Sequence, residues 1–286
     1  MVKYNWKWFC FLSLTCFLAS CTGKKAQVND EAPLLSSDTL IPVIQPEQEP
    51  EVEIVEAPTR VDELFDDFIW NFASDERLQR RRVRFPLSII GVEGTEKVER
   101  DEWQYDHLFA DQPTYTLLFD KESELDLEGD TSLTTAEVEW VYLDSKMRQR
   151  YFFERDKGVW MLDSISLTPL SPIDDENGFV SFYSRFANDS IYQLEHLTNP
   201  IEFVTLDPDD EFSILETTLG ISQWFAFKPE LPADRLTNIN YGQANDGRSR
   251  KKILKVNGFQ DGTSIILYFR KRSGEWEMYK FEDTSI

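Results

Sequence analysis

Cysteine is nearly absent from this sequence: its 286 residues include three, Cys10, Cys16 and Cys21. All three stand near the N-terminus, so the rest of the chain has no thiol for a disulfide, a nucleophile or a metal site. Histidine is limited to His107 and His196. A glycine-rich phosphate loop, a serine elbow and the His/Asp spacing of a metal site are also missing. These absences exclude the enzyme classes that need such motifs, and no cofactor or metal is predicted.

Long apolar runs are equally scarce, and the one present lies at the N-terminus. Lys3 and Lys7 precede an apolar stretch over 8–19 that is too short to span a bilayer. The stretch ends in Leu-Ala-Ser-Cys at 18–21, the order of a lipobox. It resembles the signals of bacterial lipoproteins, which implies a signal peptide over 1–20 and a lipid on Cys21 with acyl chains such as palmitate. The alternative is a short buried helix with an incidental cysteine.

Residues 21–59 are predicted to be an acylated, disordered tether. The stretch 26–58 is rich in proline and acids and has almost no aromatic residue, so it cannot bury enough apolar surface to order itself. Two or three acyl chains would anchor it firmly to a membrane. No aspartate follows Cys21, and by analogy with sorting rules we expect a lipid-anchored protein of a Gram-negative outer membrane. The periplasmic and cell-surface sides both remain open.

Negative charge dominates the chain. The formal net charge is −22, and removal of Lys3 and Lys7 with the signal lowers it by two, to −24. Such an excess argues against nucleic acid or an anionic lipid surface as a partner. It favours cationic partners or a solvated exterior. Phenylalanine, tryptophan and tyrosine are abundant, at 21, 8 and 10 residues, so there is material for well-packed cores.

An internal repeat organises the remainder of the sequence. Residues 65–75 match 179–189 at an offset of 114, and residues 151–160 match 267–276 at an offset of 116. A weaker match places Trp103 over Trp224. Because the matches follow one another in the same order, we predict two homologous domains, over 60–172 and 173–286.

Each repeat is predicted to begin with helices and to continue with strands. Phe65, Phe68 and Phe72 follow the i, i+3, i+7 spacing of one helix face. Asp75 and Asp189 are expected to cap a second short helix, which Pro86 and Pro200 would end. Strands are expected at 115–119, 136–143, 149–154 and 159–167, and again at 236–241, 252–256, 264–270 and 275–281, with tight hairpins at 155–158 and 271–274. Helices followed by antiparallel strands indicate an α+β fold.

This arrangement resembles a known superfamily. Helices, a tryptophan segment and a curved antiparallel sheet ending in Phe-x4-Gly-x-Trp are similar to the nuclear transport factor 2-like (cystatin-like) cone. A tandem pair on a lipobox tether resembles a family of secreted bacterial lipoproteins of unknown function. The resemblance implies helices that cover a sheet around a conical cavity. Some members are isomerases or dehydratases and many only bind or dimerise, so the fold leaves the chemistry open.

The best acid–base cluster in the sequence is the segment 103–107. Asp106 and His107 follow Trp103 and Tyr105, and the other repeat has no equivalent. These residues could form an active site in the first cavity, or they could be an exposed polar helix face with Trp103 buried. A sugar or apolar ligand could stack on Trp103, Trp140 or Trp224 if a cavity is open.

A cluster of basic residues interrupts the acidic chain at 77–84. Arg77, Arg80, Arg81 and Arg84 follow helical spacing and are predicted to form one stripe on the second short helix. The matched residues of the other repeat are Ile191, Leu194, Glu195 and Thr198, so the fold itself does not need the stripe. It could recognise an anion or dock a partner, because arginine grips carboxylates and phosphates in pairs. It could equally be compensated by the protein's own acids.

Three functions therefore follow from the sequence. The first is a membrane-anchored envelope lipoprotein that acts as a non-catalytic module for a small molecule or a protein. The second is an isomerase or dehydratase that uses the first cavity, and the third is a structural envelope component without an open cavity. Neither the ligand nor the oligomeric state follows from the sequence.

Overall fold

The computed structural model describes residues 57–172, 175, 178–243, 247–259 and 262–286, all within the unit Ile54–Ile286. The predicted signal peptide, Cys21 and nearly all of the predicted tether lie outside these residues. Among the helices of the described part, none is long and apolar enough to cross a membrane.

The two halves of the chain begin with matching pairs of helices. They are α1 (Phe65–Ser74) and α2 (Glu76–Arg81) in the first half, and α3 (Phe179–Asn188) and α4 (Ser190–Glu195) in the second. Asp75 Oδ1 accepts hydrogen bonds from the N–H groups of Arg77 and Leu78, at 2.8 and 3.1 Å. Asp189 caps α4 in the same way. The predicted N-caps are therefore confirmed.

The prolines do not end these short helices, and that prediction is wrong. Helix α2 ends at Arg81 and strand β1 (Val83–Gly91) starts two residues later; β7 (Leu197–Asp207) follows α4 in the same way. Pro86 and Pro200 lie inside these strands, each after a cis peptide bond. Both fall where the parallel ladder to the neighbouring strand is interrupted. No ladder hydrogen bond needs an N–H there, so a strand accommodates a proline.

The strands form two six-stranded sheets. The first has the order β2-β1-β6-β5-β4-β9, and the second has the order β3-β10-β11-β12-β7-β8. The remaining strands of the first half are β2 (Gly94–Val98), β3 (Thr114–Phe119), β4 (Thr135–Tyr142), β5 (Met147–Asp156) and β6 (Val159–Pro169). Those of the second half are β8 (Asp210–Leu219), β9 (Arg235–Asn240), β10 (Lys251–Gly258), β11 (Ser264–Arg272) and β12 (Glu275–Asp283). Short turns complete the list: η2 (Arg60–Asp62), η3 (Glu122–Glu124), η4 (Leu127–Gly129), η5 (Ile221–Gln223) and α5 (Trp224–Phe227).

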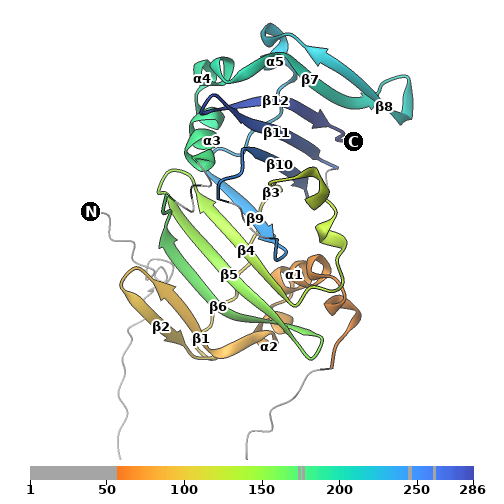
Figure 1. Ribbon diagram of the computed structural model, residues 1–286. Helices are drawn as coiled ribbons and strands as arrows, with labels where there is room; N and C mark the ends of the chain where they lie inside the picture. Colours follow the sequence, from red (N-terminus) through yellow and green to blue (C-terminus); the bar gives the residue numbers. More distant parts are fainter. Residues whose placement is uncertain (1–56, 173–174, 176–177, 244–246, 260–261) are drawn as a thin grey trace, which may run out of the picture. The chain divides into compact units, whose positions relative to one another are not determined.

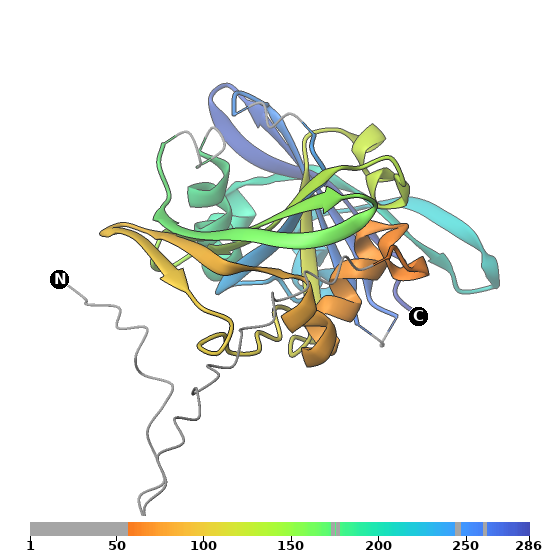
Figure 2. The same ribbon diagram turned by 90° about the horizontal axis from the view of Figure 1, so that it is seen from below.

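Both predicted hairpins are present, whereas four strands were not foreseen. Lys157 and Gly158 turn between β5 and β6 with φ of 50° and 84°, as a two-residue hairpin requires. Ser273 and Gly274 repeat this turn between β11 and β12. The unforeseen strands are β1, β2, β7 and β8, and Figure 2 shows these two hairpins reaching out on opposite sides of the sheets.

Each half of the chain contributes one strand to the sheet of the other half. Strand β9, from the second half, pairs antiparallel with β4 at the edge of the first sheet. Strand β3, from the first half, pairs antiparallel with β10 at the edge of the second sheet. Figure 1 shows β9 at the edge of the first sheet and β3 at the edge of the second. A boundary near residue 172 therefore divides the helices of the two halves but does not divide their sheets.

Two equivalent threonines join the exchanged strands. Thr116 N–H donates to Thr237 Oγ1 at 2.7 Å, and Thr237 N–H donates to Thr116 Oγ1 at 2.8 Å. The two residues are 121 positions apart, the same offset that relates Trp103 to Trp224. Both are buried, with 3% and 7% of their surface exposed. The exchange is therefore held by a reciprocal contact between corresponding residues of the repeat.

Aromatic side chains fill the space between helix and sheet in both halves. In the first half, Phe65 packs edge-on against Trp160 with ring centroids 4.9 Å apart. In the second half, Phe179 packs against Trp276 at 5.1 Å. The phenylalanines predicted on one face of α1 are all buried. An α+β fold and the helix faces are thus confirmed, and the buried side chains form two hydrophobic clusters.

Replacement of Thr116 by valine should destabilise the protein by about 1–3 kcal/mol, because it removes the acceptor for the buried Thr237 N–H. Thr95→Val, on exposed strand β2, is the matched control and should change little. The free energy of unfolding of the full-length protein, measured by urea titration, tests this. Equal losses in the two variants would contradict a specific role for the contact.

Candidate functional site

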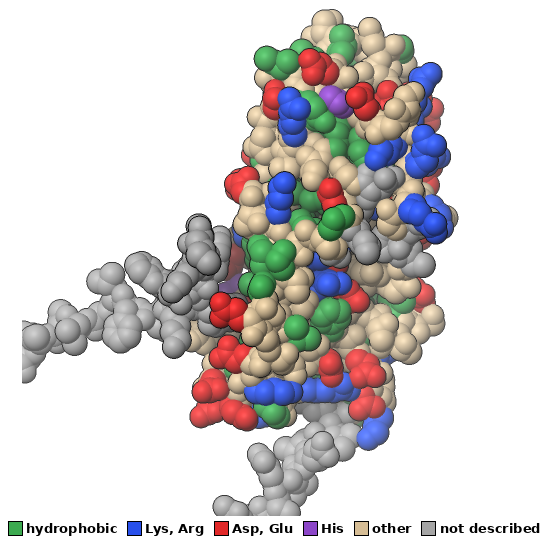
Figure 3. Space-filling view, turned by 60° about the vertical axis from the view of Figure 1, so that its left-hand side comes forward, with side chains coloured by type: hydrophobic (Ala, Val, Ile, Leu, Met, Phe, Trp, Pro, Cys, Tyr) green, Lys and Arg blue, Asp and Glu red, His purple; other side chains and the backbone are tan. Residues whose placement is uncertain are grey.

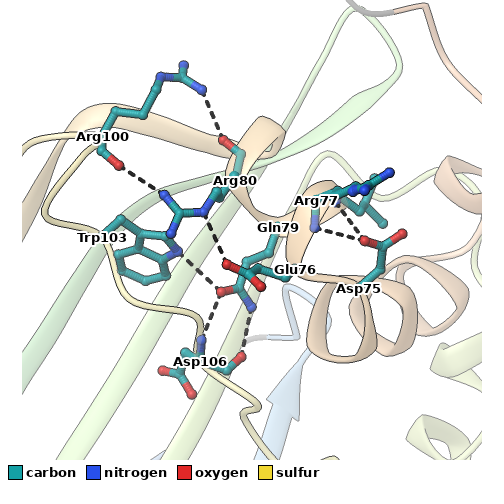
Figure 4. A network of polar contacts seen from close by, with 9 residues as sticks. Asp75, Glu76, Arg77, Gln79, Arg80, Arg100, Trp103 and Asp106 are labelled. Carbon is teal, nitrogen blue, oxygen red and sulfur yellow. Dashed lines mark hydrogen bonds and ion pairs between the residues drawn. The ribbon is translucent and has the colours of Figure 1, made fainter.

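The predicted arginine stripe is divided between two elements. Arg77, Arg80 and Arg81 lie on α2, whereas Arg84 lies on β1. Arg80 forms an ion pair with Glu76 at 3.4 Å and donates to the carbonyl of Arg100 at 3.3 Å. Arg80 is thus compensated within the first half, as Figure 4 shows.

Arg84 is surrounded by acids of its own sheet. Its guanidinium lies 2.6 Å from Glu154, 3.0 Å from Asp163 and 3.8 Å from Asp156. The hydrogen bond to Glu154 raises the pKa of Arg84 against the opposing effect of burial. These acids stand on β5 and β6, not in the second half of the chain. Arg84 therefore fills an acidic site of the first sheet.

The most buried arginine of the basic cluster at 77–84 was not singled out by the sequence. Arg82 is 1% exposed, and its Nη2 lies 3.1 Å from Asp62 Oδ2. Burial alone would raise the pKa of Asp62, but hydrogen bonds from Thr59 and Trp160 and the charge of Arg82 lower it below its ordinary value. The pair ties η2 to the end of α2. Its only signal in the sequence is the i, i+3 spacing of Arg82 from Gln79, which is also buried.

Gln79 holds the segment that carries the predicted acid–base cluster (Figure 4). Its Oε1 accepts from Trp103 Nε1 at 3.2 Å and from Asp106 N–H at 2.9 Å. Its Nε2 donates to the carbonyls of Asp106 and Phe72. In the second half Trp224 Nε1 donates to Gln193 in the same way. Because the contact recurs, the role of Trp103 is structural in both repeats.

Asp106 ends a chain of hydrogen bonds on the helix-covered face of the first sheet. Tyr151 O–H donates to Asp106 Oδ2 at 2.6 Å, and Gln149 donates to Tyr151 at 2.7 Å. Asp106 Oδ1 accepts from the N–H of Leu108. Burial and the charge of Asp106 raise the pKa of Tyr151. Both carboxylate oxygens of Asp106 are therefore occupied by protein donors.

His107 does not join Asp106. Its Nδ1 lies 3.7 Å from Asp111, its side chain is 52% exposed, and its ring contacts Tyr105. The structure brings Trp103 and Asp106 together but places His107 on the surface. The other two candidate tryptophans, Trp140 and Trp224, are buried, at 5% and 0% exposure.

A second polar cluster joins the two halves at α1. Tyr241 O–H, after β9, donates to Asp66 Oδ1 at 2.8 Å. Lys255 of β10 forms an ion pair with Glu128 at 2.6 Å. Burial, and to a lesser extent the charge of Glu128, raises the pKa of Asp66 to about 6, against the effects of Tyr241 and Lys255. In the described part of the chain no group of acids and histidines could hold a metal ion.

An open groove lies on the second sheet, where β7, β11 and β12 run side by side. Its volume is about 430 Å³, within the range of small-molecule sites. Tyr279 and polar groups line it, some uncharged and some charged with either sign: Thr198, Asn199, Glu202, Arg270, Arg272 and Glu277. Arg270 Nε lies 2.7 Å from Glu277, and the guanidinium stands 4.8 Å above the ring of Tyr279. The arginine fork is therefore fixed in orientation.

Basic residues gather at this end of the second sheet, a feature that the sequence analysis missed. Pairing of β10 with β11 sets Lys251 opposite Arg270 and brings Arg250 to Lys271. Figure 3 shows Lys and Arg side chains along one margin of the molecule. The signal in the sequence was the two basic runs at 248–252 and 270–272, which are separated along the chain but paired in the sheet.

Comparisons with known proteins agree with this architecture. The family described as Domain of unknown function (DUF4348) matches residues 46–283. A crystal structure of an NTF2-like protein from Bacteroides fragilis NCTC 9343 is 55% identical in sequence, with a TM-score of 0.75. The match covers 81% of this chain and all of that chain. A comparison with curated proteins finds no match.

Replacement of Asp66 by asparagine should stabilise the protein in a pH-dependent way. Because the pKa of Asp66 is about 6 in the folded state and 3.8 ordinarily, the folded protein binds this proton more tightly. Asp66 therefore supports stability at low pH, and this support is lost as the pH rises from about 4 to above 6. Asp66→Asn should exceed the wild type by up to about 3 kcal/mol at pH 7.5 and match it below pH 4.

Unfolding by denaturant across this pH range measures the difference. Asp67→Asn, an exposed neighbour on the same helix, is the control. A difference between Asp66→Asn and wild type that stays constant with pH would show that burial does not perturb the carboxyl.

Proposed function

The chain belongs to the DUF4348 family of domains of unknown function, and we propose that it is a lipid-anchored envelope protein that binds a small ligand without transforming it. The groove between β7 and β11 is the binding site in this proposal. The observation that carries the proposal is this open groove, in which two arginines, two glutamates and a tyrosine ring converge.

The chemistry of the groove supports binding. Small-molecule sites place a few oriented polar groups around an apolar or aromatic wall. Here Arg270 is oriented by Glu277, and Tyr279 supplies the aromatic wall. Arg272 has no ion pair within the described part of the chain and lines the same groove. A ligand can therefore satisfy an arginine that has no ion pair among the described residues.

An isomerase or dehydratase in the first half is less well supported. A general base needs a carboxylate oxygen within hydrogen-bond reach of the substrate proton. In this structure both oxygens of Asp106 accept protein hydrogen bonds, and His107 is turned toward Asp111. Catalysis by this pair would require rearrangement of both side chains.

A protein partner is a second candidate, supported by apolar side chains on the surface of the second half. They include Ile191 at 69%, Ile214 at 61%, and Phe225 and Phe227 at 47% each. The matched positions for three of them in the first half are polar: Arg77, Gln104 and Asp106. At these three positions the second half is therefore apolar where the first half is polar, as a docking surface would be.

The anchor can be tested at Cys21. Replacement by alanine removes the thiol that would carry the lipid, so the protein should move from the membrane fraction to the soluble fraction of a Gram-negative host. Fractionation followed by immunoblotting measures this. Lys24→Ala, a change beside the proposed acylation site, should leave the protein with the membrane. If Cys21→Ala also stays with the membrane, the lipid anchor is disproved.

The binding function can be tested at Thr198. Thr198→Arg places a long side chain in the groove, so ligands that raise the melting temperature of the full-length protein should lose their effect. At 100-fold excess over its dissociation constant a ligand adds about 2.7 kcal/mol to the wild type. Thr95→Arg, on β2 of the other sheet, is the control and should keep the response. A response retained in Thr198→Arg would mean that ligands bind elsewhere.

A further inference from the structure

The groove corresponds to a site that the first half fills with its own side chain. In the first sheet Arg84 reaches across β6 and β5 to three acids, Glu154, Asp156 and Asp163. The repeat offsets equate Arg84 with Thr198 and Asp163 with Tyr279. They also equate Glu154 with Arg270 and Asp156 with Arg272. Two acids of the first sheet are thus replaced by arginines in the second sheet, and Arg84 and Asp163 are replaced by uncharged residues.

The register of the strands supports this correspondence. In the first half Val83, next to Arg84, lies opposite Leu162 of β6. In the second half Leu197, next to Thr198, lies opposite Met278 of β12. Leu162 and Met278 differ by 116 positions, as the offset of the last strands requires. Arg84 and Thr198 therefore start from equivalent backbone positions, and the groove is open where the arginine side chain is missing.

The two sites differ in how their charges are satisfied. The acids of the first sheet surround an internal cation, Arg84. The arginines of the second sheet have one internal anion in contact, since Glu277 pairs with Arg270 at 2.7 Å. Within the described part of the chain, Arg272 and the neighbouring Lys251 form no ion pair. By analogy with the first half, where a cation lies among acids, an anion beside Thr198 would complete the second site.

The remaining lining indicates what carries this anion. Glu202 and Glu277 also line the groove, and their charges disfavour a doubly charged phosphate. A single carboxylate matches the arginine fork. Glutamate, threonine and asparagine side chains at the groove can accept or share hydrogen bonds with hydroxyl groups, and the Tyr279 ring offers a face for a sugar ring.

We propose that the groove binds a carboxylated sugar, with the carboxylate held by Arg270 and Arg272 and the hydroxyl groups facing Glu202 and Thr198. This inference rests on the proposed binding function and names the chemical class of its ligand. In the first sheet the positive Arg84 guanidinium lies among acids. In the second sheet the negative carboxylate of the ligand would lie among arginines at the corresponding place.

The sharpest test supplies the anion from the protein itself. Thr198→Glu places a carboxylate near Arg270 and Arg272, so it should raise the melting temperature of the full-length protein above that of Thr198→Gln by about 2–4 °C. The two variants have side chains of the same size, and both lose the hydrogen bonds of the Thr198 hydroxyl. Equal melting temperatures, or a lower one for Thr198→Glu, would overturn the proposal that the site lacks an anion.

Direct binding gives the second test. Isothermal titration should show sodium D-galacturonate bound at least about tenfold more tightly than D-galactose, and Arg272→Gln should remove this preference. Arg77→Gln, which removes one exposed positive charge from the other half, should leave it unchanged. Trigalacturonate in place of the monomer distinguishes a chain end from a free sugar acid as the source of the carboxylate.

The outcomes separate this inference from the function on which it rests. Equal binding of galactose and galacturonate, lost in Thr198→Arg, would disprove the carboxylate preference and leave a ligand-binding groove. Galacturonate binding that survives Thr198→Arg would disprove both. Absence of galacturonate binding at millimolar concentration would disprove the sugar-acid ligand, while the Thr198→Glu comparison still decides whether the site accepts an anion.

Discussion

The reciprocal contact between Thr116 and Thr237 is the constraint on which the rest of the structure depends. Four hydrogen-bonding groups, two N–H groups and two hydroxyls, are exchanged between strands that belong to different sheets. Because each strand completes the sheet of the other half, both six-stranded sheets contain residues of both repeats. The two repeats that the sequence presents in series are therefore interlocked in one compact unit.

The two halves share their architecture but differ at positions outside the pairing of β3 and β9. The contact of Gln79 with Trp103 recurs as Gln193 with Trp224, so both repeats share it. The chain of Tyr151 and Asp106 has no counterpart, since Leu267 and Phe227 stand at the matched positions. Comparison of the two halves thus separates contacts that the fold requires from contacts that one half alone has acquired.

The arginines of the basic cluster at 77–84 are neighbours in sequence but make different contacts. Arg82 is buried against Asp62, Arg84 fills an acidic site, and Arg77 stays on the surface of α2. Helical spacing predicted one stripe, but the helix ended before Arg84 because β1 pairs with β6 from Val83 onward. A contact with a strand eighty residues away cannot be read from local periodicity, and neither can the groove, whose walls come from three strands.

Local patterns were sufficient for the elements whose determinants lie within a few residues. The buried phenylalanines of α1, the aspartate caps and the glycine hairpins follow from side-chain spacing, capping hydrogen bonds and positive φ, and the structure has all of them. The repeat itself was also evident, because it is a property of the sequence. Tertiary structure alone decided which sheet each of β3 and β9 enters, and therefore that the halves are interlocked. It also decided that Arg270, Arg272 and Thr198 share one groove, because the register between distant strands depends on the packing of whole sheets and not on any single segment.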